Sequence, residues 1–407
     1  MKYREMKYRE FIFDAGKGYV RNDKIEKMRN IDAIIFDCDG VLIDTKDSYD
    51  KTILKTVEYV LDGFTNSSFP NNLIPDEIVF LFKRSGGFNS DWDICYAILM
   101  FIIFNLPKEY RSFLQKAIKN IDLAKNPLEK FLLIKNSMSK YDLHKMVSKN
   151  HIEEILENLK IFAEKMDESG ILLADKILMN SIDKSARELY KKLKLILYYP
   201  PKYGKSIIPT VYEEIFCGPE LTKKIFGSPP LFYKGRGLIE NERIIIKHET
   251  LDQLAGLLGK ANFGIASGSR FIPAKYILGD LLNYFKRDAM IFLDDIEGEE
   301  EKLKSEGKIS ANLVRQSVLM KPNPFSLIKA VEGLKECNLP LYIGDSMEDF
   351  ATVENARKRN YDFIFAGVYS QSNFKDELLQ SFLRAKIEII LPSVNELPTI
   401  LREIRKE

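Results

Sequence analysis

Six short apolar runs, each closed by small or polar residues, constrain the fold of this chain more than any other feature. They stand at residues 31–37, 262–269, 289–295, 339–346, 361–369 and 387–393. Segments with helical periodicity, such as 324–336 and 348–359, separate the later runs. Strands and helices that alternate in this way are typical of a parallel sheet with right-handed crossovers. The sequence therefore predicts an α/β fold with a Rossmann-like parallel sheet as its core.

One long stretch interrupts this alternation. Residues 47–246 have mostly helical patterning, and a segment of this length is not a loop in a compact domain. We expect an inserted α-helical domain there, a sheet domain made of 31–46 and 247–407, and an N-terminal extension at 1–30. Within the insertion, the apolar segment 94–104 is too short to span a membrane and is predicted to be a buried helix.

Composition excludes several classes of protein. Lys plus Arg number 61 and Asp plus Glu 59, so the net charge of +2 gives no basic surface for nucleic acid. The four cysteines have no CxxC spacing and the three histidines no HxxxH spacing, which argues against a zinc site and fits a reducing compartment. The charged start of the chain lacks the apolar core of a signal peptide. We expect a cytoplasmic protein without nucleic-acid or membrane partners.

The first apolar run ends in a pair of aspartates. In "IIFDCDG", Asp37 and Asp39 follow the strand and Gly40 comes next. Open α/β sheets bind ligands at the carboxyl ends of their strands, and two carboxylates this close repel each other unless a cation or proton lies between them. The alternative is an Asx turn that ends the strand, and this motif alone leaves both interpretations open.

Polar groups also follow the later runs. They are Ser267-Gly268-Ser269, Lys321 in "MKPNP", and Asp345 with Asp349 in "GDSMED". Parallel strand ends converge, so we expect these groups to share one crevice with the first aspartates. Together they offer carboxylates for a hard cation, a hydroxyl and N–H groups for anion oxygens, and one ammonium group. Mg²⁺ prefers such oxygen ligands.

In this order, the four groups resemble the four signature motifs of the haloacid dehalogenase superfamily, which is dominated by Mg-dependent phosphatases. The match covers about 32–46 and 247–407. The resemblance implies that Asp37 is a nucleophile that forms an aspartyl-phosphate and that Asp39 is the general acid and base. Dehalogenating members lack an acid two residues after the nucleophile, so Asp39 favours phosphoryl transfer.

The resemblance also assigns the remaining motif residues. It implies that Ser267 and the N–H of Gly268 hold phosphoryl oxygens, with Ser269 and Gly40 also at the substrate. Lys321 would balance the charge between the nucleophile and the phosphate.

For the metal, the resemblance implies a Mg²⁺ site. Asp37, Asp345 and the main-chain carbonyl of Asp39 would be ligands. Asp349 would bind the ion directly or through a water molecule.

The helical insertion lies where the superfamily has its cap domain, which closes over the crevice and selects the substrate. The insertion is larger than the compact helical caps expected of such relatives. Its additional part, at 105–205, has no interpretable motif, so a role in stability or self-association stays as open as a catalytic one. The segment "KRSGGFNSDWD" at 83–93 is predicted to contact the substrate through Asn89 and Trp92, because its glycines let the backbone approach a ligand. The alternative is a helix end, a glycine turn and an N-cap at Asp91.

Two segments imitate the first motif. "FIFDAG" at 11–16 has Gly16 where an acid is needed, so we interpret it as a surface strand. "LDDIEGEEE" at 293–301 is predicted to be a strand end followed by a solvated helix start.

The sequence thus predicts a Mg-dependent phosphatase that hydrolyses a small phosphorylated metabolite through an aspartyl-phosphate. A phosphomutase of the same superfamily is an alternative, since "DGV" and a helical cap occur there too. A non-catalytic binding protein is a further alternative, against which the full set of carboxylates argues.

Overall fold

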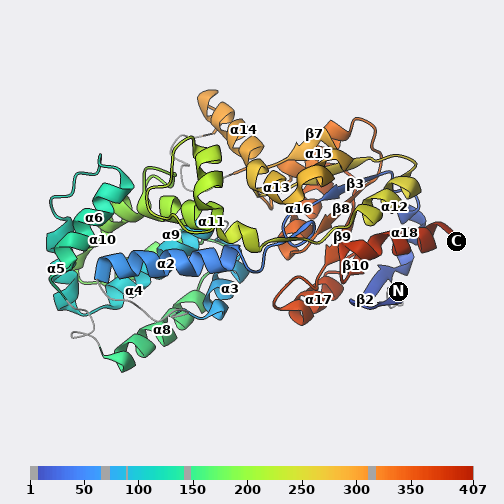
Figure 1. Cartoon of the computed structure of the whole chain (residues 1–407). Coiled ribbons are helices and arrows are strands. Elements are labelled where there is room, and N and C mark those ends of the chain that lie inside the picture. Colours follow the sequence, from blue (N-terminus) through green and yellow to red (C-terminus); the bar gives the residue numbers. More distant parts are fainter. Residues whose placement is uncertain (1–7, 66–73, 89, 142–147, 310–317, 407) are drawn as a thin grey trace. The chain divides into compact units, whose positions relative to one another are not determined.

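The computed structural model describes residues 8–65, 74–88, 90–141, 148–309 and 318–406. The chain divides into two compact units (Figure 1). The sheet unit consists of Met1–Lys46 and Glu242–Glu407, and the helical unit of Asp47–Asn241.

The sheet unit is built on an eight-stranded sheet with the strand order β1-β2-β10-β9-β8-β3-β6-β7. The strands are β1 (Tyr8–Phe13), β2 (Gly16–Arg21), β3 (Ala33–Phe36), β6 (Phe263–Ala266), β7 (Phe285–Ile291), β8 (Pro340–Gly344), β9 (Ile364–Val368) and β10 (Ile389–Leu391). Neighbouring strands from β10 to β7 pair in parallel, whereas β1 and β2 are antiparallel. The predicted α/β fold with a Rossmann-like sheet is therefore confirmed.

Both faces of this sheet are covered by helices, which explains the unbroken apolar runs. On β3, Ile34 and Phe36 belong to one buried cluster, and Ala33 and Ile35 belong to a second. The first cluster includes residues of α12 (His248–Leu258), α13 (Phe271–Leu278) and α18 (Leu397–Lys406). The second includes residues of α15 (Phe325–Leu334), α16 (Met347–Arg357) and α17 (Lys375–Arg384). A strand buried on both faces has no position at which a polar side chain is favoured.

The N-terminal residues join the sheet, which differs from the separate extension expected at 1–30. The hairpin of β1 and β2 adds two strands, with Val20 of β2 opposite Ile389 of β10. The Tyr369 hydroxyl accepts a hydrogen bond from Lys17 N at 3.0 Å and donates one to Lys17 O at 2.9 Å. "FIFDAG" thus lies in the edge strand and its turn, as the surface-strand interpretation expected, and Ile12 is 85% exposed.

A short ladder marks where the chain returns from the helical unit. β5 (Arg243–Ile244) pairs antiparallel with β4 (Ile43–Asp44). Residues 242–246 consequently belong to the sheet unit, although the sequence analysis assigned them to the helical insertion.

The second aspartate-rich imitation also has a structural explanation. Its residues open α14 (Leu293–Ser305) after β7. Asp294 Oδ2 accepts a hydrogen bond from Phe271 N at the start of α13, and Asp295 Oδ2 accepts one from Phe292 N, both at 2.9 Å. The expected helix start is confirmed, and both carboxylates satisfy helix termini.

The helical unit contains nine described α-helices. They are α2 (Tyr49–Thr65), α3 (Asp76–Arg84), α4 (Asp91–Asn105), α5 (Lys108–Ile118), α6 (Pro127–Met138), α8 (Lys149–Glu164), α9 (Ile171–Ser181), α10 (Arg187–Leu197) and α11 (Ile207–Phe226). Every residue of α4 from 93 to 104 is buried, so the predicted buried helix is confirmed. Across the described ranges, no helix has the length and apolar character needed to cross a membrane.

Candidate active site

The first aspartate lies directly beyond the central strand β3. Asp37 N donates a hydrogen bond to Ile343 O of β8 at 2.8 Å, and the residue is only 7% exposed. The chain then turns sharply, because Gly40 has a φ of +70° and its N–H donates to Ile43 O at 2.8 Å. Glycine adopts this left-handed conformation without a Cβ penalty.

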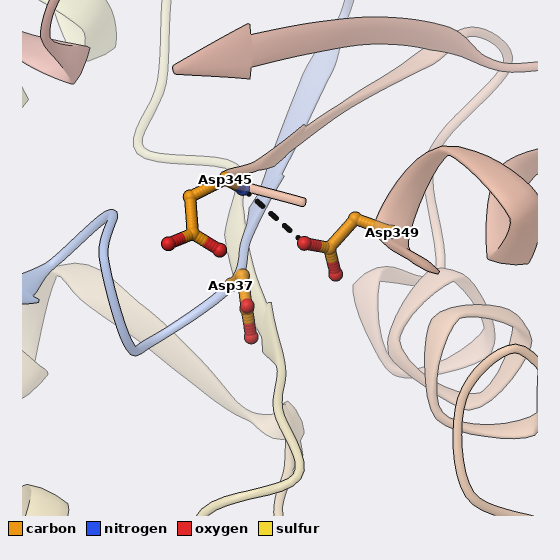
Figure 2. A group of neighbouring side chains, drawn as sticks. All are labelled: Asp37, Asp345 and Asp349. Carbon is orange, nitrogen blue, oxygen red and sulfur yellow. Dashed lines mark hydrogen bonds between the residues drawn. The ribbon is translucent and has the colours of Figure 1, made fainter. Parts of the chain in front are cut away.

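Three carboxylates meet at this strand end (Figure 2). Asp37, Asp345 and Asp349 each offer one oxygen, and these oxygens lie within 4.8 Å of one another. Asp345 follows the last residue of β8, and Asp349 lies in the first turn of α16. The cluster therefore draws on two adjacent strand ends and one helix start.

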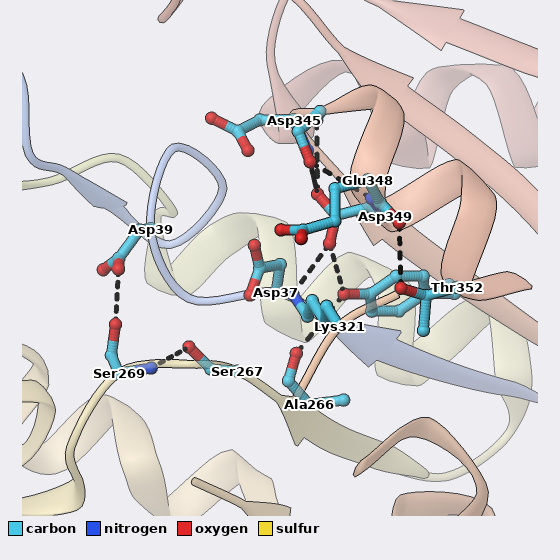
Figure 3. A network of polar contacts seen from close by, with 12 residues as sticks. Asp37, Asp39, Ala266, Ser267, Ser269, Lys321, Asp345, Glu348, Asp349 and Thr352 are labelled. Carbon is cyan, nitrogen blue, oxygen red and sulfur yellow. Dashed lines mark hydrogen bonds and ion pairs between the residues drawn. The ribbon is translucent and has the colours of Figure 1, made fainter. Parts of the chain in front are cut away.

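A single lysine joins two of these carboxylates (Figure 3). Lys321 Nζ lies 2.8 Å from Asp37 Oδ1 and 2.7 Å from Asp349 Oδ1. The lysine is 8% exposed, so its charge is surrounded almost entirely by protein groups and not by water. Since charged hydrogen bonds in such surroundings are strong, Lys321 fixes the orientation of both carboxylates.

The charge of this cluster is not balanced by the protein. Burial raises the pKa of Asp37 to about 7, although the Lys321 ammonium opposes the shift. Burial also raises the pKa of Asp345 well above its ordinary value, and the Asp349 and Asp37 carboxylates add to the effect. When all three carboxylates are ionised, the one ammonium leaves two negative charges uncompensated. A divalent cation with oxygen ligands, such as Mg²⁺, would relieve this repulsion, so the residues fit the expected metal.

Asp349 differs from the other two carboxylates. Burial opposes its ionisation, but contacts with Lys321, Ser346 and Tyr342 lower its pKa below the ordinary value. Its Oδ2 accepts hydrogen bonds from Ser346 Oγ at 2.6 Å, and from Ser346 N and Asp345 N at 3.2 Å. Tyr342 and Ser346 are the polar partners that the sequence analysis missed. The one visible signal was a hydroxyl inside the otherwise apolar strand "PLYIG".

The serine motif lies beyond the end of the neighbouring strand β6. Ser269 Oγ donates a hydrogen bond to Asp39 Oδ2, and Ser269 N donates to Ser267 Oγ at 3.0 Å (Figure 3). Ser267 N in turn donates to Ile291 O of β7 at 3.0 Å. A Cβ on Gly268 would meet only the Met320 side chain, at an ordinary 3.4 Å, so space alone does not require glycine there.

The structure thus brings together the predicted residues of the sheet unit. The residues of the sheet unit are Asp37, Asp39, Gly40, Ser267, Gly268, Ser269, Lys321, Asp345 and Asp349. Trp92 belongs to the helical unit and is half-buried in the first turn of α4, and Asn89 lies outside the described residues.

The described part of the 83–93 segment has the features of a turn and a helix cap. Gly86 has a φ of +74°, and a Cβ on Gly87 would lie 2.2 Å from Asp167 O, so close backbone packing requires that glycine. The N-cap is Ser90, whose Oγ accepts a hydrogen bond from Trp92 N, and not Asp91 as the turn-and-cap interpretation expected.

The lysine at the start of this segment is also engaged. Lys83 Nζ lies 2.6 Å from Asp50 Oδ1 and 3.6 Å from Asp91 Oδ1. Within the helical unit, Lys83 therefore has two carboxylate partners.

Comparison with known proteins shows the fold of the chain and leaves its family open. No family model matches the chain, and no curated protein matches it. An X-ray structure from the Northeast Structural Genomics Consortium has 18% sequence identity and a TM-score of 0.56, and the likeness covers 92% of this chain and 100% of that one. A structure described as phosphatase Tt82 from Thermococcus thioreducens has 19% identity and a TM-score of 0.46, with 86% of this chain and 98% of that chain covered. The similarity to the first of these structures shows a shared fold.

Proposed function

We propose that the protein is a Mg-dependent phosphatase of the haloacid dehalogenase type, acting on a small phosphorylated metabolite. The observation that carries the proposal is the contact of Lys321 Nζ with Asp37 Oδ1 at 2.8 Å. Asp345 belongs to the same carboxylate cluster, and Asp39 is two residues after Asp37. A nucleophile, a cation-binding carboxylate and a fixed ammonium group next to one another are what phosphoryl transfer requires.

In the proposed reaction, a free oxygen of Asp37 attacks phosphorus and the bond from phosphorus to the ester oxygen breaks. Asp39 gives a proton to the departing oxygen, which leaves as an alcohol. Asp39 then takes a proton from a water molecule, and that water attacks the phosphorus of the aspartyl-phosphate. Inorganic phosphate leaves and Asp37 is restored. General acid–base catalysis of this kind typically contributes about 10²–10⁴-fold.

The surrounding groups hold the reacting parts in place. Lys321 and the Ser267 hydroxyl would face oxygens of the phosphoryl group. Mg²⁺, held by Asp37 and Asp345, would supply positive charge next to those oxygens. Asp349 is assigned to Lys321 in this proposal, because its oxygens already accept hydrogen bonds from protein donors.

A phosphate-release assay over sugar phosphates, phosphoglycolate, nucleotides and amino-alcohol phosphates tests the proposal. We expect release that needs Mg²⁺ and is abolished in Asp37→Asn, whose amide cannot attack phosphorus. Release by Asp37→Asn near the wild-type rate would contradict the nucleophile. Phosphate exchange that needs a bisphosphate activator, with little net release, would instead indicate the phosphomutase.

The helical unit is proposed to act as the cap that selects the substrate. The support is its position in the sequence, directly after the first motif. In this proposal Trp92→Ala lowers kcat/KM for the metabolite and spares a compact artificial ester, because only the metabolite has a non-reacting part to contact. Equal losses on both esters would count against substrate contact by Trp92.

A further inference from the structure

A buried tyrosine touches the candidate site from inside the sheet. Tyr342 lies in the middle of β8 and has no exposed surface. Its hydroxyl is 2.8 Å from Asp349 Oδ1 and 3.3 Å from Ala266 O. Both of these atoms are acceptors and a phenol has one hydrogen, so the shorter contact to the carboxylate takes it.

This hydrogen bond completes the set of partners around Asp349. Oδ1 accepts from Lys321 Nζ at 2.7 Å and from Tyr342, and Oδ2 accepts from the Ser346 hydroxyl and from two backbone N–H groups. An ionised carboxylate has about four lone-pair positions. Protein donors therefore occupy the positions through which Asp349 would bind a cation.

The same contact bears on Lys321. Its Nζ lies 5.6 Å from the centre of the Tyr342 ring and is held between Asp37 Oδ1 and Asp349 Oδ1. Without the Tyr342 hydroxyl, Lys321 would be the one donor left at Oδ1 in the described structure, and the carboxylate would be held mainly through Oδ2. Oδ1, the atom that Lys321 contacts, would then be less firmly fixed.

We propose that Tyr342 is a positioning residue, which holds Asp349 on Lys321 and keeps it from becoming a metal ligand. The inference rests on the proposed phosphatase function for its catalytic consequence. Tyr342 touches no reacting atom in this proposal. It acts through Asp349 on the orientation of Lys321.

The variant Tyr342→Phe removes the hydroxyl and keeps the ring. Its matched control is Tyr369→Phe, since Tyr369 is a buried tyrosine of the same core cluster whose hydroxyl hydrogen-bonds to the backbone of Lys17 and not to the carboxylate cluster. We expect kcat of Tyr342→Phe to fall about tenfold, the effect of one hydrogen bond to a charged group, with KM within about twofold of wild type. Tyr369→Phe should keep the wild-type kcat and lose thermal stability to a similar extent.

A second readout uses Mn²⁺ as a probe without substrate, followed by electron paramagnetic resonance. Loss of the hydroxyl frees a lone pair on Asp349, so Tyr342→Phe is expected to bind Mn²⁺ more tightly than wild type. If Tyr342 only supported the fold, Tyr342→Phe would bind Mn²⁺ more weakly than wild type, in proportion to its loss of melting temperature. Weaker binding, or a kcat equal to that of Tyr369→Phe, would overturn the proposal.

The two proposals fail in different ways. A wild-type protein that binds Mn²⁺ but releases no phosphate from any ester would refute the phosphatase function, and the Mn²⁺ affinities would still decide the role of Tyr342. A protein that binds no Mn²⁺ would refute both.

Discussion

The Cα of Gly40 lies so close to the Asp345 side chain that a Cβ on residue 40 would be 1.8 Å from Asp345 Oδ2. The residue also has a φ of +70°, which side chains rarely adopt. The loop after Asp37 and the Asp345 carboxylate after β8 therefore pack against each other with no room for a side chain at residue 40.

Gly40→Ala should consequently damage metal binding. The methyl group has to displace the Asp345 carboxylate, so we expect the Mg²⁺ concentration for half-maximal activity to rise about tenfold or more. Gly259→Ala is the control. Gly259 has a φ of +76°, and in the described structure no neighbouring atom lies within 4 Å of the position that a methyl group would take. The control variant therefore has the backbone strain of Gly40→Ala without its steric clash. An unchanged Mg²⁺ requirement in Gly40→Ala would show that Asp345 is not a ligand.

Asp345 and Asp349 should respond differently to the same substitution. Asp345→Asn is expected to abolish Mn²⁺ binding, because this carboxylate is a proposed ligand. Asp349→Asn should still bind Mn²⁺ and should lose kcat by about 100-fold, because Lys321, the group proposed to face the developing charge, loses one of its two charged partners. Calorimetric titration with Mn²⁺ and steady-state kinetics on both variants make the comparison. Equal loss of Mn²⁺ binding would show that Asp349 is a ligand as well.

The effect of Ser269→Ala on the rate of aspartyl-phosphate formation should depend on the leaving group. Ser269 Oγ holds Asp39 Oδ2, so its loss lets the proposed general acid move. In single-turnover experiments, formation of the aspartyl-phosphate from an alkyl phosphate should slow about tenfold, since that leaving group needs a proton. The same step with p-nitrophenyl phosphate should be nearly unchanged. Ser326→Ala is the control, because its buried hydroxyl has no hydrogen-bond partner in the described structure. Equal slowing with both esters would contradict the assignment.

The stability of the helical unit should fall as pH rises from about 4 to about 7. Burial raises the pKa of Asp93 to about 7, against the hydrogen bond that the Tyr198 hydroxyl donates to it. The folded state therefore keeps a proton on Asp93 between about pH 4 and 7 that the unfolded chain has released. Stability is full below that range and is lost at up to about 1.4 kcal/mol per pH unit within it.

The only tryptophan of the chain, Trp92, lies next to Asp93 and makes the measurement selective for the helical unit. Denaturant unfolding followed by its fluorescence should show the loss in wild type. Asp93→Asn should show a flatter dependence, because an amide does not titrate. Parallel curves for the two proteins would disprove the role of Asp93.

Much of the sheet unit could be predicted from the sequence, because its strands carry their own signal. The run at 34–36 is apolar without interruption since both faces of β3 are buried, and the polar residue types after each strand follow from their position at the sheet's carboxyl edge. The contact of the Tyr342 hydroxyl with Asp349 could not be predicted, because it depends on where the following helix, α16, packs against β8. The pairing of the hairpin at 8–21 with the sheet was missed for a similar reason: its partner strand, β10, is at the other end of the sequence.

The role of the 83–93 segment could not be predicted either. Its two glycines suit a ligand-binding loop and a packed turn equally well in sequence. Only the position of residues 167–170 shows that Gly87 is needed for backbone packing, and those residues lie far along the chain.

The pairing of the first hairpin with the last strand also bears on synthesis. The Tyr8 hydroxyl donates to Ile387 O across 379 positions of the chain. At a translation rate of about 5–20 residues per second, these partners leave the ribosome roughly 20–80 s apart. All of Asp47–Asn241 is synthesised in that interval, before β6 or β8 exists to flank β3. A nascent chain can therefore complete its helical unit while β3, the strand that leads to Asp37, still has no neighbours, and the candidate active site is among the last parts of the protein to form.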